Sequence, residues 1–180
     1  QKESSVFIGG ELSKRRGNIL TYQARGELCI VGEEDLGEFR LSGDIQSKFR
    51  LLGKDATIQA DGYITNTTPA FFQRRFQSHY FMWNNEFKKT RNTYVGGTVS
   101  VDQTRTQISA GVKNIENFVY FDAKGLPAQP GKNIQVFAVR LKQDFRYKAL
   151  GWENEVVYQE SSNNDVLPLP KLSAYSNLYL

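Results

Sequence analysis

The chain alternates apolar and polar residues over unusually long runs. In residues 39–51 every second position is apolar or small, and no charge falls among these positions. The positions between them hold polar or charged residues: Arg40, Ser42, Asp44, Gln46, Lys48 and Arg50. Since successive side chains of a β-strand point to opposite faces, this period of two predicts a strand with one apolar and one polar face.

Several further runs repeat the pattern. In residues 137–148 the alternate positions are apolar except at Gln143, and the positions between them include Arg140, Lys142, Asp144 and Arg146. Similar runs cover residues 20–30, 56–64 and 150–159. Residues typical of turns separate these runs, at 16–18, 32–37, 53–55, 66–69, 102–104 and 124–131. We therefore expect ten or eleven consecutive antiparallel strands joined mostly by short links, and no helix.

The expected strands are long enough to cross a lipid bilayer. A typical soluble strand has about 5–6 residues, whereas a tilted strand that crosses a bilayer needs roughly 9–11. A basic side chain facing lipid near the bilayer centre would cost roughly 2–4 kcal/mol, and the alternation keeps the basic residues off the apolar face. The sequence thus predicts an all-β fold, an antiparallel up-and-down transmembrane β-barrel. Residues 1–180 would form one unit, a portion of a larger barrel.

This fold assigns a role to each face. The apolar face, with Leu41, Ile45, Val139 and Leu141, would contact lipid, and the aromatic residues near the run ends would lie at the membrane interfaces. These aromatic residues are Tyr22, Phe39, Phe49, Tyr147, Trp152 and Tyr158. The predicted pore-lining residues are Arg40, Asp44, Lys48, Arg50, Arg140, Lys142, Asp144 and Arg146. A soluble β-sandwich or calyx explains the alternation equally well.

Composition is compatible with a barrel. The mean hydropathy is −0.50, and 39% of the residues are hydrophobic, because the two faces of a barrel strand average out. No run of 18 apolar residues occurs, which excludes a spanning helix. The charge of +4 is too small to indicate nucleic acid. No leader precedes Gln1, so we expect any targeting segment to have been removed or to lie outside this sequence.

Candidate chemistry is sparse. Cys29 is the single cysteine and His79 the single histidine, and no acidic residue lies near His79 in sequence. Carboxylates occur in residues 33–35 and at Glu153 and Glu155, where a glycosidase-like pair is possible. A solvated loop cluster and a row of polar strand residues explain them more simply. We therefore predict no catalytic residue, cofactor or metal, and no enzyme.

Basic and aromatic residues cluster twice. Arg74 and Arg75, and Lys88 and Lys89 with Arg91, could bind lipopolysaccharide phosphates or tune a lumen toward anions. They could also be ordinary loop or strand-end charges, which we favour. Residues 71–76 could stack on nucleic-acid bases, but a segment at the membrane interface is the simpler interpretation.

The second half of the chain resembles a known family. The similar segments are residues 78–87, 110–117, 119–122, 157–162, 166–170 and 175–179. They resemble the Putative porin family of Bacteroides-type bacteria. The resemblance implies an outer-membrane β-barrel with a pore-like role, in a family whose members are longer than this chain and whose pattern contains no catalytic residues.

The function expected is passive diffusion of small hydrophilic solutes through an outer-membrane porin, with a slight preference for anions. Expected partners are outer-membrane lipid and lipopolysaccharide, with protein partners or a homo-oligomer also open, and no nucleic acid. One alternative is an occluded scaffold barrel that binds proteins through residues 122–131 and 161–170. A second alternative is a soluble ligand-binding calyx.

Overall fold

Nine strands form one antiparallel sheet. The structure, a computed structural model, describes residues 4–16, 19–51 and 53–180, with the backbone alone for Leu51. The predicted turn residues 17–18 lie outside the described residues. The strands are β1 (Val6–Lys14), β2 (Leu20–Val31), β3 (Phe39–Leu51), β4 (Lys54–Thr67), β7 (Thr90–Val101), β8 (Thr106–Glu116), β11 (Ile134–Tyr147), β12 (Leu150–Ser161) and β13 (Leu172–Tyr179).

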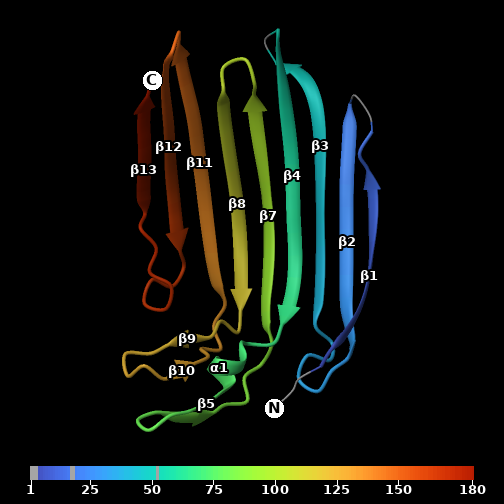
Figure 1. Cartoon of the computed structure of the whole chain (residues 1–180), viewed down its shortest axis with the longest axis vertical. Helices are drawn as coiled ribbons and strands as arrows, with labels where there is room; N and C mark the ends of the chain where they lie inside the picture. The colour runs from blue at the N-terminus through green and yellow to red at the C-terminus, as the bar shows by residue number, and fades with distance from the viewer. Residues whose placement is uncertain (1–3, 17–18, 52) are drawn as a thin grey trace.

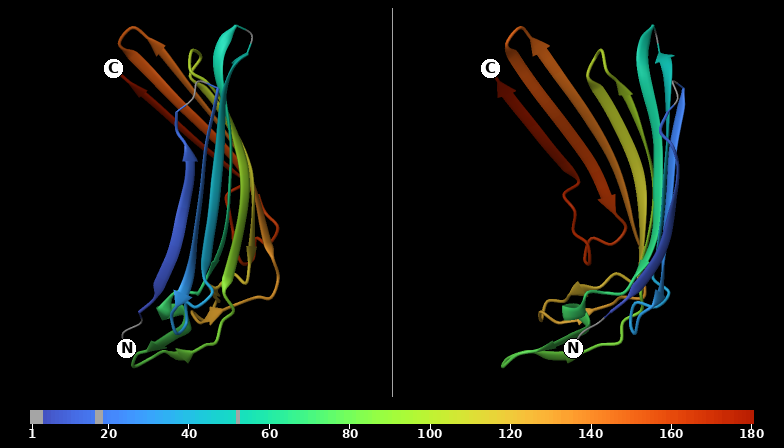
Figure 2. Two further views of the ribbon diagram at one scale, coloured as in Figure 1. Left: turned by 90° about the vertical axis from the view of Figure 1, so that its right-hand side faces the viewer. Right: turned by 45° about the vertical axis from the view of Figure 1, so that its right-hand side comes forward.

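Each long strand pairs with the long strand that precedes it, in the order β1-β2-β3-β4-β7-β8-β11-β12-β13 (Figure 1). This confirms an all-β, antiparallel up-and-down arrangement. The sequence predicts ten or eleven consecutive strands, whereas the large sheet contains nine. The sheet is curved and open, with β1 and β13 as free edges (Figure 2).

Strand register separates two faces of this sheet. Residues paired across antiparallel strands lie on the same face. One row of partners runs from Gln23 through Asp44, Asp61, Gly96, Gly111 and Ala138 to Gln159; we call its face the polar face. The next row runs from Tyr22 through Ile45, Ala60, Gly97, Ala110, Val139 and Tyr158 to Leu172, and its face is the apolar face.

The apolar face keeps charge away from its centre. Its charged strand residues are Lys14, Lys54, Arg91, Glu116 and Glu160. Each of them occupies one of the first two or last two positions of its strand. The middle of this face is therefore a continuous band without charge, as a bilayer requires.

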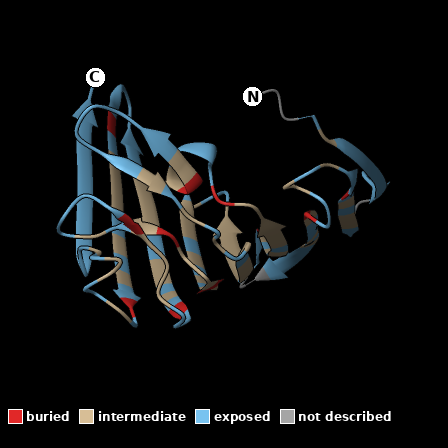
Figure 3. Ribbon diagram, turned by 90° about the horizontal axis from the view of Figure 1, so that it is seen from below, coloured by how far each residue is buried: buried red, intermediate tan, exposed pale blue. Residues whose placement is uncertain are grey.

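The part of the chain that the structure describes leaves this face exposed. Leu41 and Ile45 are each 54% exposed and Leu141 is 43% exposed, while Val139 is half-buried. Among the described residues the buried apolar side chains are Cys29, Ala56, Ile115, Val119 and Ile134. The sheet thus has almost no dry core of its own (Figure 3).

The two ends of the sheet differ. At one end short turns connect the strands, for example residues 102–105 and 148–149. At the other end the connections are residues 32–38, 68–89, 117–133 and 162–171. The second and third of these loops lie over the concave side of the sheet (Figure 3).

These two loops contain the remaining elements: α1 (Phe71–Arg74), β5 (Arg75–Gln77), β6 (Met82–Asn84), β9 (Tyr120–Phe121) and β10 (Pro127–Ala128). The sequence analysis predicts no helix, but the structure has a helix of four residues, α1. It ends where Arg75 adopts an extended conformation. No helix in the part of the chain that the structure describes has the length and hydrophobicity to cross a membrane.

Candidate functional site

Most polar-face residues of β4 and β8 are less exposed than their neighbours on the apolar face, which assigns the polar face to the concave side of the curved sheet. A hollow on it is lined by residues from five neighbouring strands, including Tyr63, Tyr94, Ser109, Arg140 and Gln159. All eight predicted pore-lining residues belong to this face, because register links the even positions of β3 to those of β11. That they line a pore stays a prediction.

Charges on the polar face balance over the described strands. The basic residues are Arg25, Arg40, Lys48, Arg50, Lys113, Arg140, Lys142 and Arg146. The acidic residues are Glu11, Glu27, Asp44, Asp55, Asp61, Asp144, Glu153 and Glu155. The predicted set held six basic and two acidic residues, so its net charge gave the expectation of anion preference. Counted over all the described strands, the polar face has no such excess.

Many of these charges form ion pairs between neighbouring strands. Arg25 Nε lies 2.9 Å from Glu11, Arg40 Nη1 lies 2.6 Å from Glu27, and Arg140 Nε lies 3.2 Å from Glu155. All of these side chains are about a third to three-fifths exposed, so water screens each pair and its contribution to stability is small. Their main effect is to fix charged groups at defined positions on the polar face.

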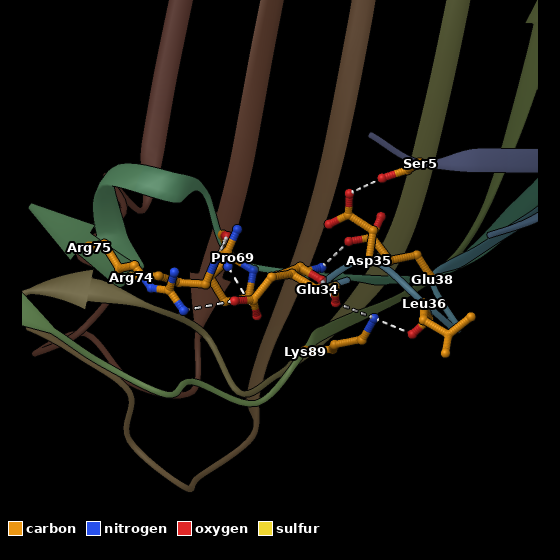
Figure 4. Close-up of polar contacts among 10 residues, drawn as sticks. Ser5, Glu34, Asp35, Leu36, Glu38, Pro69, Arg74, Arg75 and Lys89 are labelled. Atoms are coloured by element: carbon orange, nitrogen blue, oxygen red, sulfur yellow. Dashed lines mark hydrogen bonds and ion pairs between the residues drawn. The ribbon is translucent and has the colours of Figure 1, made fainter. Parts of the chain in front are cut away.

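At the long-loop end, Glu34 binds two arginines (Figure 4). Its carboxylate lies 3.2 Å from Arg74 Nη1 and 3.0 Å from Arg75 Nη2. Arg74 is 5% exposed, and its Nε donates a hydrogen bond of 2.9 Å to the Pro69 carbonyl. Lys89 Nζ donates to the carbonyl oxygens of Glu34, at 3.1 Å, and Leu36, at 2.7 Å. We call this group, with Thr68 and Glu38, the loop clamp.

Hydrogen bonds of Thr68 complete the clamp. Its backbone N–H donates to Glu38 Oε1 at 2.5 Å, and its hydroxyl donates to the Glu34 carbonyl at 3.1 Å. Nearby, the Ser5 hydroxyl donates to Asp35 Oδ2 at 2.6 Å. The loop of residues 32–38 is therefore fastened to both ends of the loop of residues 68–89.

The loop clamp refines two sequence interpretations. Glu34 and Asp35 are not part of a purely solvated cluster, since both accept contacts from other segments. Arg74, Arg75 and Lys89 do lie in a loop or at strand ends, as expected, but they also bind residues of the 32–38 loop. The signal that could have shown this was the opposite charge of the two clusters.

Aromatic rings connect the two long loops. Phe76 stacks on Trp83 with ring centroids 4.8 Å apart, and Phe121 lies 6.2 Å from Trp83. Gln129 Nε2 donates to the carbonyls of Lys88 and Asn117. Residues 71–76 thus contribute to a loop layer at the end of the sheet. Residues 122–131 and most of 161–170 lie at the same end.

The remaining candidates are not members of the loop clamp. His79 is exposed between β5 and β6 and makes an edge contact with the Tyr80 ring at 5.2 Å. Glu153 accepts a hydrogen bond of 3.0 Å from the Tyr179 hydroxyl and belongs to the polar face, as does Glu155. Over the described residues, histidine, cysteine and carboxylate side chains form no group of three that could hold a metal ion.

Comparison with known proteins gives one match. The model of the family described as Putative porin matches residues 1–180, and so extends the resemblance from the second half to the whole chain. No curated protein and no solved structure gives a significant match. The chain belongs to the Putative porin family.

Proposed function

We propose that the chain is part of an outer-membrane β-barrel that lets small hydrophilic solutes diffuse passively through its interior. The observation that carries this proposal is the exposed apolar face, whose central band is free of charge in a chain with almost no dry core. In water such a face would be a large exposed hydrophobic patch. Against acyl chains it is the expected surface of a barrel.

A closed barrel needs more strands than these nine. The edge strands β1 and β13 present unpaired backbone groups, which a bilayer does not tolerate. Both strands run in the same direction (Figure 1), so pairing them directly would create a parallel contact. An antiparallel barrel has an even number of strands. We infer that an odd number of further strands, from the rest of a longer chain, completes it.

The different ends of the sheet suggest its orientation. Bacterial barrels have short periplasmic turns and longer extracellular loops. The loop clamp and the aromatic layer would then lie at the extracellular mouth. There they would narrow the entrance, since the loops of residues 68–89 and 117–133 lie over the concave side (Figure 3).

Two measurements on the intact protein test this function. We expect stepwise conductance in planar bilayers, and heat-modifiable mobility in detergent electrophoresis. Heat-modifiable protein without any conductance would reject the pore and favour the occluded scaffold, which the loops over the concave side also allow. A detergent-free soluble monomer would reject the membrane barrel, and would leave the calyx alternative to explain the exposed apolar face.

Ion selectivity gives a more specific prediction. Asp44 and Asp61 are direct partners on adjacent strands, and replacing both by Asn turns a balanced polar face into one with two excess positive charges. Charged side chains that line a pore set its selectivity. The reversal potential in a salt gradient should therefore shift toward the equilibrium potential of the anion.

Asp165→Asn, in an exposed loop, is the control for the Asp44→Asn/Asp61→Asn variant and should leave the reversal potential unchanged. An open channel whose reversal potential is the same in the double variant and in the wild type would show that β3 and β4 do not line the conducting path.

A further inference from the structure

Strand β7, in the middle of the sheet, carries no charge on the polar face. On β7 the polar-face positions are Thr90, Asn92, Tyr94, Gly96, Thr98 and Ser100. The strands on either side do carry charge on this face, with Asp61 on β4 and Lys113 on β8. A neutral strip of hydroxyl, amide and aromatic groups therefore runs along the middle of the concave surface.

Two tyrosines form an aromatic surface on this strip. Tyr94 lies across Gly96 and Gly111: a Cβ atom at Gly96 would overlap the tyrosine hydroxyl, and one at Gly111 would come within 2.7 Å of the ring. Tyr63 is the direct partner of Tyr94 on β4. Their ring centroids lie 5.3 Å apart, with planes inclined by 27°. The missing side chains of the two glycines thus create the space in which the Tyr94 ring lies.

Hydrogen-bonding groups surround these rings. The hollow that contains both tyrosines is also lined by Thr98, Gln107, Ser109 and Gln159. Hydroxyl and carboxamide groups both donate and accept hydrogen bonds. Lys113 and Arg140 also line the hollow, and Arg140 Nε lies 3.2 Å from Glu155 Oε1.

This combination of groups matches the chemistry of a sugar ring. A sugar presents C–H groups on its faces, which pack on aromatic rings, and hydroxyl groups around its edge, which need donors and acceptors. Binding sites in general combine aromatic or apolar walls with a few placed polar groups.

We propose that the hollow around Tyr63 and Tyr94 is a binding subsite for the sugar ring of a hydroxyl-rich solute. The inference rests on the proposed function, which makes this surface the wall of a solute path. A neutral sugar uses the rings and the neutral groups alone. An acidic sugar would also use Lys113. Comparing the binding of a neutral and an acidic sugar therefore shows which of the two classes of solute the subsite accepts.

The test uses the intact protein in planar bilayers, with maltose, glucuronate and a polyethylene glycol of similar mass as probes. We expect maltose to reduce the current at a concentration at least tenfold below that of the polyethylene glycol. Lower half-blocking concentrations for glucuronate than for maltose would assign the acidic sugar, and the reverse order the neutral one. Equal potency of the sugars and the polyethylene glycol would overturn the proposal.

Adjacent glycines provide matched variants. Gly96→Ala forces the Tyr94 ring off its position, and should raise the half-blocking sugar concentration at least tenfold while the open-channel conductance is kept. Gly97→Ala places its methyl group on the apolar face, where the nearest atom is the Gln59 carbonyl oxygen at 3.4 Å, and should change nothing. Unchanged block in folded Gly96→Ala protein would overturn the proposal.

Two further measurements keep the test decisive. Tyr94→Ala replaces Gly96→Ala if the latter fails to show heat-modifiable mobility, with the same expected loss. Calorimetry of detergent-solubilised protein with maltose and glucuronate measures binding without requiring a pore. Sugar binding without conductance would support the subsite and reject the porin function. Conductance without sugar binding or block would support the porin function and reject the subsite.

Discussion

Leu141→Lys will lower the free energy of unfolding of the lipid-embedded protein by about 2–4 kcal/mol. Leu141 lies near the middle of β11 on the apolar face, with Ile108 and Val156 as its partners on the adjacent strands. In a barrel this position faces acyl chains, where an ammonium group loses its hydration. Denaturant titration of the refolded protein in lipid vesicles measures the loss.

The neighbouring residue provides the control. Lys142→Leu is the reverse exchange on the polar face and removes an ammonium group there. Lys142 Nζ lies 3.9 Å from Asp144 Oδ2, and both side chains are partly exposed. Loss of such a pair costs at most about 1 kcal/mol. Leu141 is 43% exposed, so water alone would accept a lysine there. Equal effects of the two substitutions in lipid would contradict the assignment of the faces.

Strand pattern made most of this sheet predictable. The alternation in residues 39–51 and 137–148 places Ile45 and Leu141 on one face and Asp44 and Lys142 on the other, and register confirms this division. The pattern could not predict the short elements of residues 70–89. Their aromatic residues resemble those of a strand, but they pack on one another in a loop layer, as Phe76 does on Trp83.

Candidate-site prediction from sequence was less complete, for two physical reasons. Charges on a strand are visible in its own alternation, but their partners depend on the register with the next strand, so the pairing of Arg40 with Glu27 was not foreseen. The loop clamp depends on contacts between segments separated by β3 and β4. Sequence shows the charge of Glu34 and of Arg74 but not their proximity.

Arg74→Met will weaken the loop clamp by about 1.5–3 kcal/mol, the range for hydrogen bonds to charged groups. The substitution keeps an apolar stem in a buried position, but removes the guanidinium from Glu34 and from the Pro69 carbonyl. Since 1.4 kcal/mol corresponds to a factor of ten, opening of the loop of residues 68–89 should become at least about tenfold more frequent. Chymotrypsin cleavage within residues 71–87, in vesicle-embedded protein, measures this opening.

Arg91→Met distinguishes the loop clamp from a general effect of losing an arginine at this end of the sheet. Arg91 Nη1 lies 4.0 Å from Glu116 and its side chain is 49% exposed, so its loss should change the cleavage rate little. Because the clamped loop lies over the concave side (Figure 3), Arg74→Met should also add current fluctuations to open channels, and Arg91→Met should not. Equal cleavage and equal current noise in the two variants would show that the Arg74–Glu34 contact does not hold the loop in place.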